Sequence, residues 1–258
     1  MTDKIATNAP SWLVEAAQED KSLEQVKQHR QLVRAKIVQG MSAHELKKQY
    51  GEGAVVMQPG GALVSPPEEP FLFVPLFMFT EYCWWSDIND KSTQSILERT
   101  FDPVHPIAMK SKDKARREET YKVGGANYKY RFVEHLVFPG LIYGGENKMQ
   151  PITISFERGE YKNGKGFCSA ITMRRIGERV APLWSQVWQL KTSLRTRGDH
   201  PWWGFDYSTP TEPFIDQHDA EGFRKLWEQL REQHDERLLF VDHADEEAES
   251  VSLEDSEM

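Results

Sequence analysis

The sequence predicts a mainly β (α+β) protein, in which helices flank a strand-rich core. Apolar and aromatic residues gather in short runs with strand-like alternation, and glycine and proline separate these runs. Helical spacing is clear mainly toward the two ends of the chain. The 258 residues include 8 Trp and are 39% hydrophobic, which is enough for a sizeable core.

The first segment is expected to be helical with one strand. A helix over 23–38 is predicted after the N-cap Ser22, because apolar residues recur there at helical spacing. A second helix is predicted over 42–50 with Ser42 as its N-cap. A strand at 54–57 follows between glycine-rich turns.

The core alternates strands with two short helices. The predicted strands are 71–82, 128–143, 151–156, 184–197 and 202–207. Gly198-Asp199 joins the last two as a hairpin turn. Helices are predicted over 92–99 and from about Gly166 to Arg175, where apolar residues return to helical spacing.

The chain ends in a helix and an acidic tail. Phe223, Leu226, Trp227 and Leu230 follow i, i+3, i+4, i+7 spacing, which predicts a helix from the N-cap Asp219 to about Arg231. Beyond Phe240 large apolar residues are few, which is typical of disorder. The predicted organisation is a helical and loop segment (1–65), a core (66–215), a C-terminal helix (216–240) and a disordered acidic tail (241–258).

Charge is segregated along the chain. The net charge is −8, and the segment from Val241 to Met258 holds eight acidic residues with no Lys or Arg, so the rest of the chain is neutral. From Met109 to Arg197, Lys and Arg outnumber Asp and Glu by 18 to 8. This local surplus of +10 indicates a surface for a polyanion, which the whole-chain charge hides.

Several classes of protein are disfavoured. No apolar run is long enough to span a membrane, and no apolar segment of a secretory signal follows Met1. Cys83 and Cys168 are far apart, so we expect reduced thiols in a cytoplasmic protein. No phosphate-binding loop, metalloprotease motif or nucleophile elbow occurs, and no cofactor is expected.

One enzymatic alternative stays open. A metal-dependent nuclease needs carboxylates and a lysine on adjacent elements, and one set of residues has this composition. It consists of Glu134, Glu157, Glu160 and Lys162.

The residues of the basic region suit a single strand of nucleic acid, which is held by cations along its phosphates and by rings that stack on its bases. The first group of candidates is Lys110, Lys112, Lys114, Arg116, Arg117, Lys129, Tyr130 and Arg131. The second group is Arg158, Lys162, Lys165, Arg174, Arg175, Lys191, Arg195 and Arg197. The run at 110–117 fits a solvated basic loop equally well.

Adjacent tryptophans are the candidates for stacking. Neighbours in a strand point to opposite faces, so one ring of Trp84–Trp85 and one of Trp202–Trp203 should face outward. An outward Trp beside a basic row is unusual for a plain surface.

An aromatic, basic, β-rich core followed by an acidic tail resembles bacteriophage single-stranded DNA-binding proteins. Three segments carry the likeness: Pro-Ser-Trp-Leu at 10–13, Glu-His-Leu-Val-Phe-Pro-Gly at 134–140 and Pro-Leu-Trp-Ser-Gln-Val-Trp-Gln-Leu at 182–190. The resemblance implies an elaborated OB-like β-barrel with N- and C-terminal flanking helices. The tail departs from the pattern, because it ends in Met258 rather than in an apolar or aromatic tip after the acids.

The resemblance also implies a role. It predicts sequence-nonspecific binding of single-stranded DNA during phage replication or recombination, in the host cytoplasm and without catalysis. The acidic tail would either occupy the basic groove or dock replication or recombination proteins. A strand-annealing recombination protein is the alternative within the same class, and self-association stays open.

Overall fold

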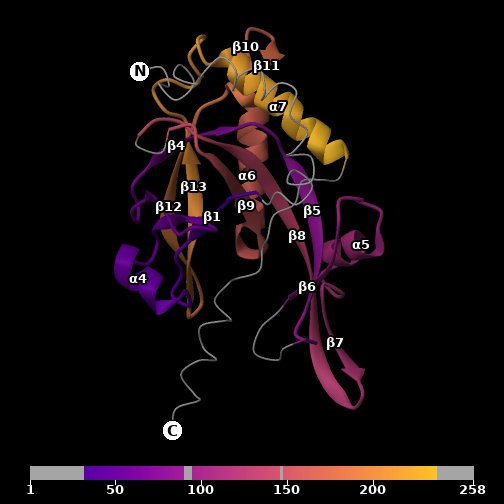
Figure 1. Cartoon of the computed structure of the whole chain (residues 1–258). Coiled ribbons are helices and arrows are strands. Elements are labelled where there is room, and N and C mark those ends of the chain that lie inside the picture. Colours follow the sequence, from indigo (N-terminus) through magenta and orange to yellow (C-terminus); the bar gives the residue numbers. More distant parts are fainter. Residues whose placement is uncertain (1–31, 90–94, 146–147, 237–258) are drawn as a thin grey trace, which may run out of the picture.

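The computed structural model describes residues 32–89, 95–145 and 148–236, which form one large sheet, one two-stranded sheet and four helices (Figure 1). The mainly β class is therefore confirmed. The strands of the large sheet are β1 (Arg34–Ile37), β2 (Val55–Gln58), β3 (Leu63–Ser65), β4 (Phe71–Pro75), β5 (Phe79–Ser86), β6 (Ser95–Thr100), β7 (Glu118–Val123), β8 (Ala126–Ile142), β9 (Pro151–Glu157), β12 (Trp188–Arg197) and β13 (His200–Ser208).

The other elements cover or extend this sheet. The helices are α4 (His44–Tyr50), α5 (Pro106–Lys112), α6 (Tyr161–Met173) and α7 (Ala220–Asp235). The small sheet pairs β10 (Arg175–Ile176) with β11 (Arg179–Val180), and two 3-10 turns are η1 (Arg158–Glu160) and η2 (Leu183–Ser185). Within the described ranges, no helix is both long and apolar enough to cross a membrane.

Strand β8 organises the sheet. Its C-terminal half pairs with β4 and β9, and its N-terminal half pairs with β5 and β7. The main path runs β13-β12-β4-β8-β9-β1-β2-β3, so β1–β3 belong to the same sheet as the core strands. In the described part of the chain, no strand ladder closes this path into a barrel.

The sheet nevertheless curls until its two halves touch. Gln39, just after β1, exchanges two 2.8 Å hydrogen bonds with the main chain of Trp203 on β13. Thr192 on β12 donates to the carbonyl of Gly53 at 2.7 Å. These side-chain bonds join the β12–β13 hairpin to the β1–β2 region without a ladder.

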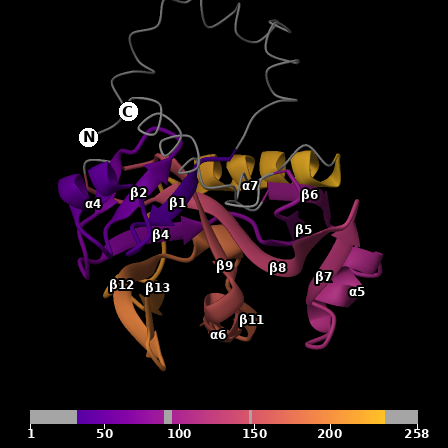
Figure 2. The same ribbon diagram turned by 90° about the horizontal axis from the view of Figure 1, so that it is seen from below.

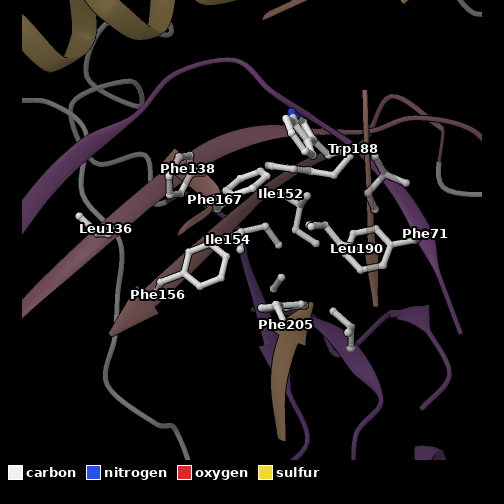
Figure 3. Close-up of a cluster of buried hydrophobic side chains, with 14 of the residues drawn as sticks. Phe71, Leu136, Phe138, Ile152, Ile154, Phe156, Phe167, Trp188, Leu190 and Phe205 are labelled. Atoms are coloured by element: carbon white, nitrogen blue, oxygen red, sulfur yellow. The ribbon is translucent and has the colours of Figure 1, made fainter. Parts of the chain in front are cut away.

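The main core fills the inside of this curl (Figure 3). Phe167 of α6 is fully buried, and its ring centre lies 5.1 Å from those of Phe138 and Trp188. A Cβ at Gly164 would approach Phe156 to 2.5 Å, so glycine lets α6 sit directly on the sheet. Burying one such ring stabilises the fold by about 2–3 kcal/mol.

Most predicted elements are present. The strands predicted at 54–57, 128–143, 151–156 and 184–197 correspond to β2, β8, β9 and β12, and the hairpin to β13 forms as expected. Helices α4 and α7 also match. Helix α6 begins at Tyr161 rather than near Gly166, because η1 leads the chain directly into it.

Several local predictions were wrong. Residues 34–37 form β1 rather than helix, since the backbone finds partners in β2 and β9. Residues 95–100 form β6 rather than helix, with Ile96 packed beside Trp85. The predicted strand 71–82 is two strands, β4 and β5. In each case, tertiary pairing outweighs local propensity.

The predicted cap of α4 was also wrong. Ala43 occupies the N-cap position, and Ser42 Oγ instead accepts a 2.8 Å bond from the backbone N–H of Gln39. The start of the predicted 23–38 helix and the acidic tail lie outside the described residues.

Candidate nucleic-acid interface

Two hairpins project from the same side of the molecule (Figure 1). One is the β12–β13 hairpin. The other, here called the β7–β8 arm, consists of β7, residues 126–132 of β8, and α5 packed on them. The N-terminal end of α6 lies between the two when the molecule is viewed from below (Figure 2). Most predicted binding residues lie on these three elements.

The densest basic run divides between α5 and the loop that follows. Lys110 Nζ lies 3.4 Å from Glu119 and 4.5 Å from the centre of the Phe132 ring. Lys112 is exposed, with Nζ 5.1 Å from the Tyr82 ring centre. Arg116 pairs with Asp113 at 3.6 Å, whereas Lys114 and Arg117 are exposed without such a partner among the described residues. The run therefore contains both structural and available cations.

The alternation of rings and charges on β8 separates them onto two faces. Tyr128, Tyr130 and Phe132 point to the face covered by α5, and Lys129 and Arg131 point to the other. Tyr130 is only 9% exposed. The single mixed surface suggested by the sequence is thus a ribbon with rings on one face and cations on the other.

The junction between β9 and α6 adds a second group of cations. Arg158, Lys162 and Lys165 are exposed. The Arg158 guanidinium lies 5.8 Å from the centre of the Trp85 ring, which is buried at 5% exposure. Burial, and next the charge of Arg158, lower the pKa of Arg131. Like charges are therefore held close together here.

On the β12–β13 hairpin, Arg195, Trp202 and Trp203 already have partners within the fold. Arg195 pairs with Glu160 at 2.8 Å and with Asp206 at 2.9 Å. Trp202 Nε1 donates to Glu160 at 3.0 Å. Trp203 covers Gly53, where a Cβ would lie 2.7 Å from its ring. Trp202 and Trp203 do point to opposite faces, but each is half-buried.

Other candidates on the two arms differ in availability. Lys191 is exposed on β12. Arg197 belongs to β12, but its side chain lies outside the described features. Trp84 is half-buried, with its ring 5.8 Å from Phe132 and nearly parallel to it.

Arg174 and Arg175 lie apart from the other candidates, beside the small β10–β11 sheet at the opposite end of α6 (Figure 1). Arg174 donates to the carbonyls of Val187 (2.6 Å) and Pro213 (3.0 Å) and stacks 3.7 Å above Trp188. Burial lowers the pKa of Arg174. Arg175 donates to the carbonyl of Glu178 at 2.8 Å. Both side chains stabilise local structure.

A subset of the basic residues is exposed and has no carboxylate within ion-pair distance in the described part of the chain. We call this subset the unpaired cations. Its thirteen members are Lys48, Lys112, Lys114, Arg117, Lys122, Lys129, Lys148, Arg158, Lys162, Lys165, Arg175, Arg179 and Lys191. Nine of them lie on the β7–β8 arm, in the loop that leads into it, at the start of α6 or on β12. The other four are Lys48 on α4, Lys148 before β9, and Arg175 and Arg179 on the small β10–β11 sheet.

The carboxylates of the nuclease alternative do not come together. Glu134 and Glu157 lie on opposite faces of the sheet, because Glu157 is paired across from His135, the neighbour of Glu134. Glu160 is held by Arg195. Within the described residues, no cluster of three His, Cys, Asp or Glu side chains could hold a metal.

Sequence reasoning missed a buried row of charge on the sheet. Glu81 and His135 are fully buried and directly paired across β5 and β8, and His135 Nδ1 lies 2.9 Å from Glu157. Arg99 contacts Glu81 at 3.3 Å. Burial, and then neighbouring Glu81, raise the pKa of the Cys83 thiol. The available signal was a glutamate inside the apolar run that leads to Trp85.

The fold and this surface define a mainly β protein in which nine of the thirteen unpaired cations lie on two hairpins and one helix end. The chain belongs to the Pam3 phage gp34-like protein family, whose model matches residues 2–233. This membership indicates a bacteriophage protein. A search of curated proteins and a search of solved structures each gave no match.

Proposed function

We propose that this phage protein binds single-stranded DNA without sequence preference and acts in replication or recombination in the host cytoplasm. The observation that carries the proposal is that nine of the thirteen unpaired cations lie on the β7–β8 arm and the loop that leads into it, at the start of α6 and on β12. Cations with intramolecular carboxylate partners contribute less to binding, because each phosphate contact must first displace the acid. The unpaired cations are free of this cost.

An OB-like core is part of the proposal. The sheet curls, and side-chain hydrogen bonds between β1–β2 and β12–β13 join its two halves. OB folds are partly open barrels that bind extended strands on one face and with their loops. Here the two projecting hairpins would take the place of such loops.

The direct test is a titration of single-stranded and double-stranded oligonucleotides at several salt concentrations. We expect tighter binding to the single strand, and log affinity should fall linearly with log salt, with a slope of roughly −0.7 per phosphate contact. Tryptophan fluorescence and mobility shift report the binding. A flat salt dependence would contradict the electrostatic basis, strand cleavage would favour the nuclease, and duplex products would favour strand annealing.

The acidic tail is proposed to compete with DNA. It carries eight acidic side chains and no Lys or Arg, so it can occupy the same cations at high effective concentration. Removing 241–258 should tighten single-strand binding and weaken recruitment of partner proteins. The gain should be largest at low salt, because at physiological ionic strength charges are screened over about 8 Å. Titration of one oligonucleotide against full-length and truncated protein at two salt concentrations measures this gain in affinity. Equal affinities at low salt would limit the role of the tail to partner docking or solubility.

A further inference from the structure

Aromatic side chains form a continuous row on one face of the β7–β8 arm. The row, here called the ring row, consists of Phe132, Trp84, Tyr130, Tyr121 and Tyr128. Trp84 lies 5.8 Å from Phe132 and 5.4 Å from Tyr130, and Tyr121 lies 4.4 Å from Tyr130. Tyr121 and Tyr128 are direct cross-strand partners near the Gly124–Gly125 turn.

The row changes from buried to half-exposed along the arm. Ile107 and Ala108 of α5 pack on the cluster that contains Tyr130 and Phe132, which are 9% and 4% exposed. Tyr121 and Tyr128 stay half-exposed toward the tip. The inner rings are therefore buried at the base of the arm, and only Tyr121 and Tyr128 near its tip are partly accessible to solvent.

The other candidate rings are committed within the fold. Trp202 bonds to Glu160, and Trp203 covers Gly53. Trp85 is 5% exposed beneath Arg158. Tyr121 and Tyr128 are half-buried like Trp202 and Trp203, and Tyr121 accepts a 3.2 Å hydrogen bond from Lys110 Nζ. What distinguishes the two tyrosines is their place near the tip of a projecting ribbon that carries unpaired cations on its other face.

Charge around the row indicates its occupant. Lys122 and Lys129 lie on the opposite face of the same ribbon, and Lys114 and Arg117 lie in the segment just before β7. All four are unpaired cations. Among the described residues, β7 pairs with β8 alone, so its outer edge is open. Adjacent strands are about 5 Å apart, so a nucleotide along this edge can reach rings on one face and cations on the other.

We propose that Tyr121 and Tyr128 are the base-stacking residues of this protein, holding single-stranded DNA along the β7 edge of the arm. This inference rests on the proposed function, and it moves stacking from the tryptophan pairs to two tyrosines of the β7–β8 arm. Bases in a duplex are already stacked on one another, so the rings favour the single strand. Stacking accepts every base, which agrees with binding that ignores sequence.

The experiment separates rings from charge. Tyr121→Leu/Tyr128→Leu keeps apolar volume but removes the flat ring, and Tyr50→Leu on α4 is the matched control at another half-exposed tyrosine. Each protein is titrated with an oligothymidylate and with an abasic oligonucleotide of equal length and charge. We expect the double variant to lose about tenfold affinity for the oligothymidylate, to bind the abasic strand unchanged and to keep its salt slope.

The outcomes are distinct. Equal loss on both strands, or no loss on either, would overturn the stacking role while wild-type binding still supports the proposed function. Failure of the wild type to bind either strand would overturn both. A second measurement uses the unaltered protein and so does not depend on whether the variants fold. A single strand containing 5-iodouracil should be photo-crosslinked to peptides that contain Tyr121 or Tyr128. Crosslinks confined to other peptides would contradict the proposal.

Discussion

Replacing Lys114, Arg117, Lys122 and Lys129 together by glutamine should lower single-strand affinity about a hundredfold at moderate salt. Each of these residues is exposed on the arm without a carboxylate partner among the described residues. Each lost phosphate contact removes roughly 0.7 from the salt slope, so the slope should become about 3 less steep. A salt-dependent titration measures both quantities.

The matched control removes the same charge from the opposite part of the molecule. Its four exposed residues, neutralised in the same way, are Arg179, Arg224, Lys225 and Arg231. The whole-chain charge changes equally in the two variants, so long-range repulsion is matched. If the control loses as much affinity and slope as the arm variant, binding responds to net charge alone and the arm is not the contact surface.

Gly140→Ala should strongly destabilise the protein. A Cβ at this position would overlap the carbonyl oxygen of Val74 and lie 2.5 Å from the Phe73 ring. Gly140 is paired with Pro75 where β8 meets β4, so the backbone cannot yield without breaking that pairing. Overpacking of this kind costs about 3 kcal/mol, which lowers the melting temperature by about 10 °C in a protein of this size.

Gly222→Ala is the counterpart of this variant, and we expect it to raise the stability of the protein. Gly222 lies in the first turn of α7, and a Cβ there would meet no atom within 4 Å. Alanine should stabilise the helix by about 0.5 kcal/mol. Thermal unfolding followed by circular dichroism measures both variants. Similar melting temperatures for the two would show that close approach at Gly140 does not limit the packing of β8 on β4.

The candidate site was partly predictable from the sequence. The surplus of Lys and Arg over 109–197 located the region, because charge composition is a local property. The sequence could not show which of these Lys and Arg residues have partners within the fold. Arg195 and Lys191 occupy similar positions on one strand, yet Arg195 is held by Glu160 from η1, which is distant in sequence. The alternation of side chains along a strand correctly placed Trp202 and Trp203 on opposite faces. The contacts of the two rings come from distant segments, from Glu160 of η1 for Trp202 and from Gly53 for Trp203.

The sequence by itself determined the strand-rich class, the long strand β8, the β12–β13 hairpin, the amphipathic helix α7 and the segregation of charge. Each depends on side-chain periodicity, turn residues or composition, which act over a few neighbouring residues. Only the tertiary structure decided that residues 34–37 and 95–100 are strands, because both obtain their backbone partners from distant segments. It also decided which cations remain unpaired and which rings are buried, because distant elements of the fold supply the carboxylates and the packing partners.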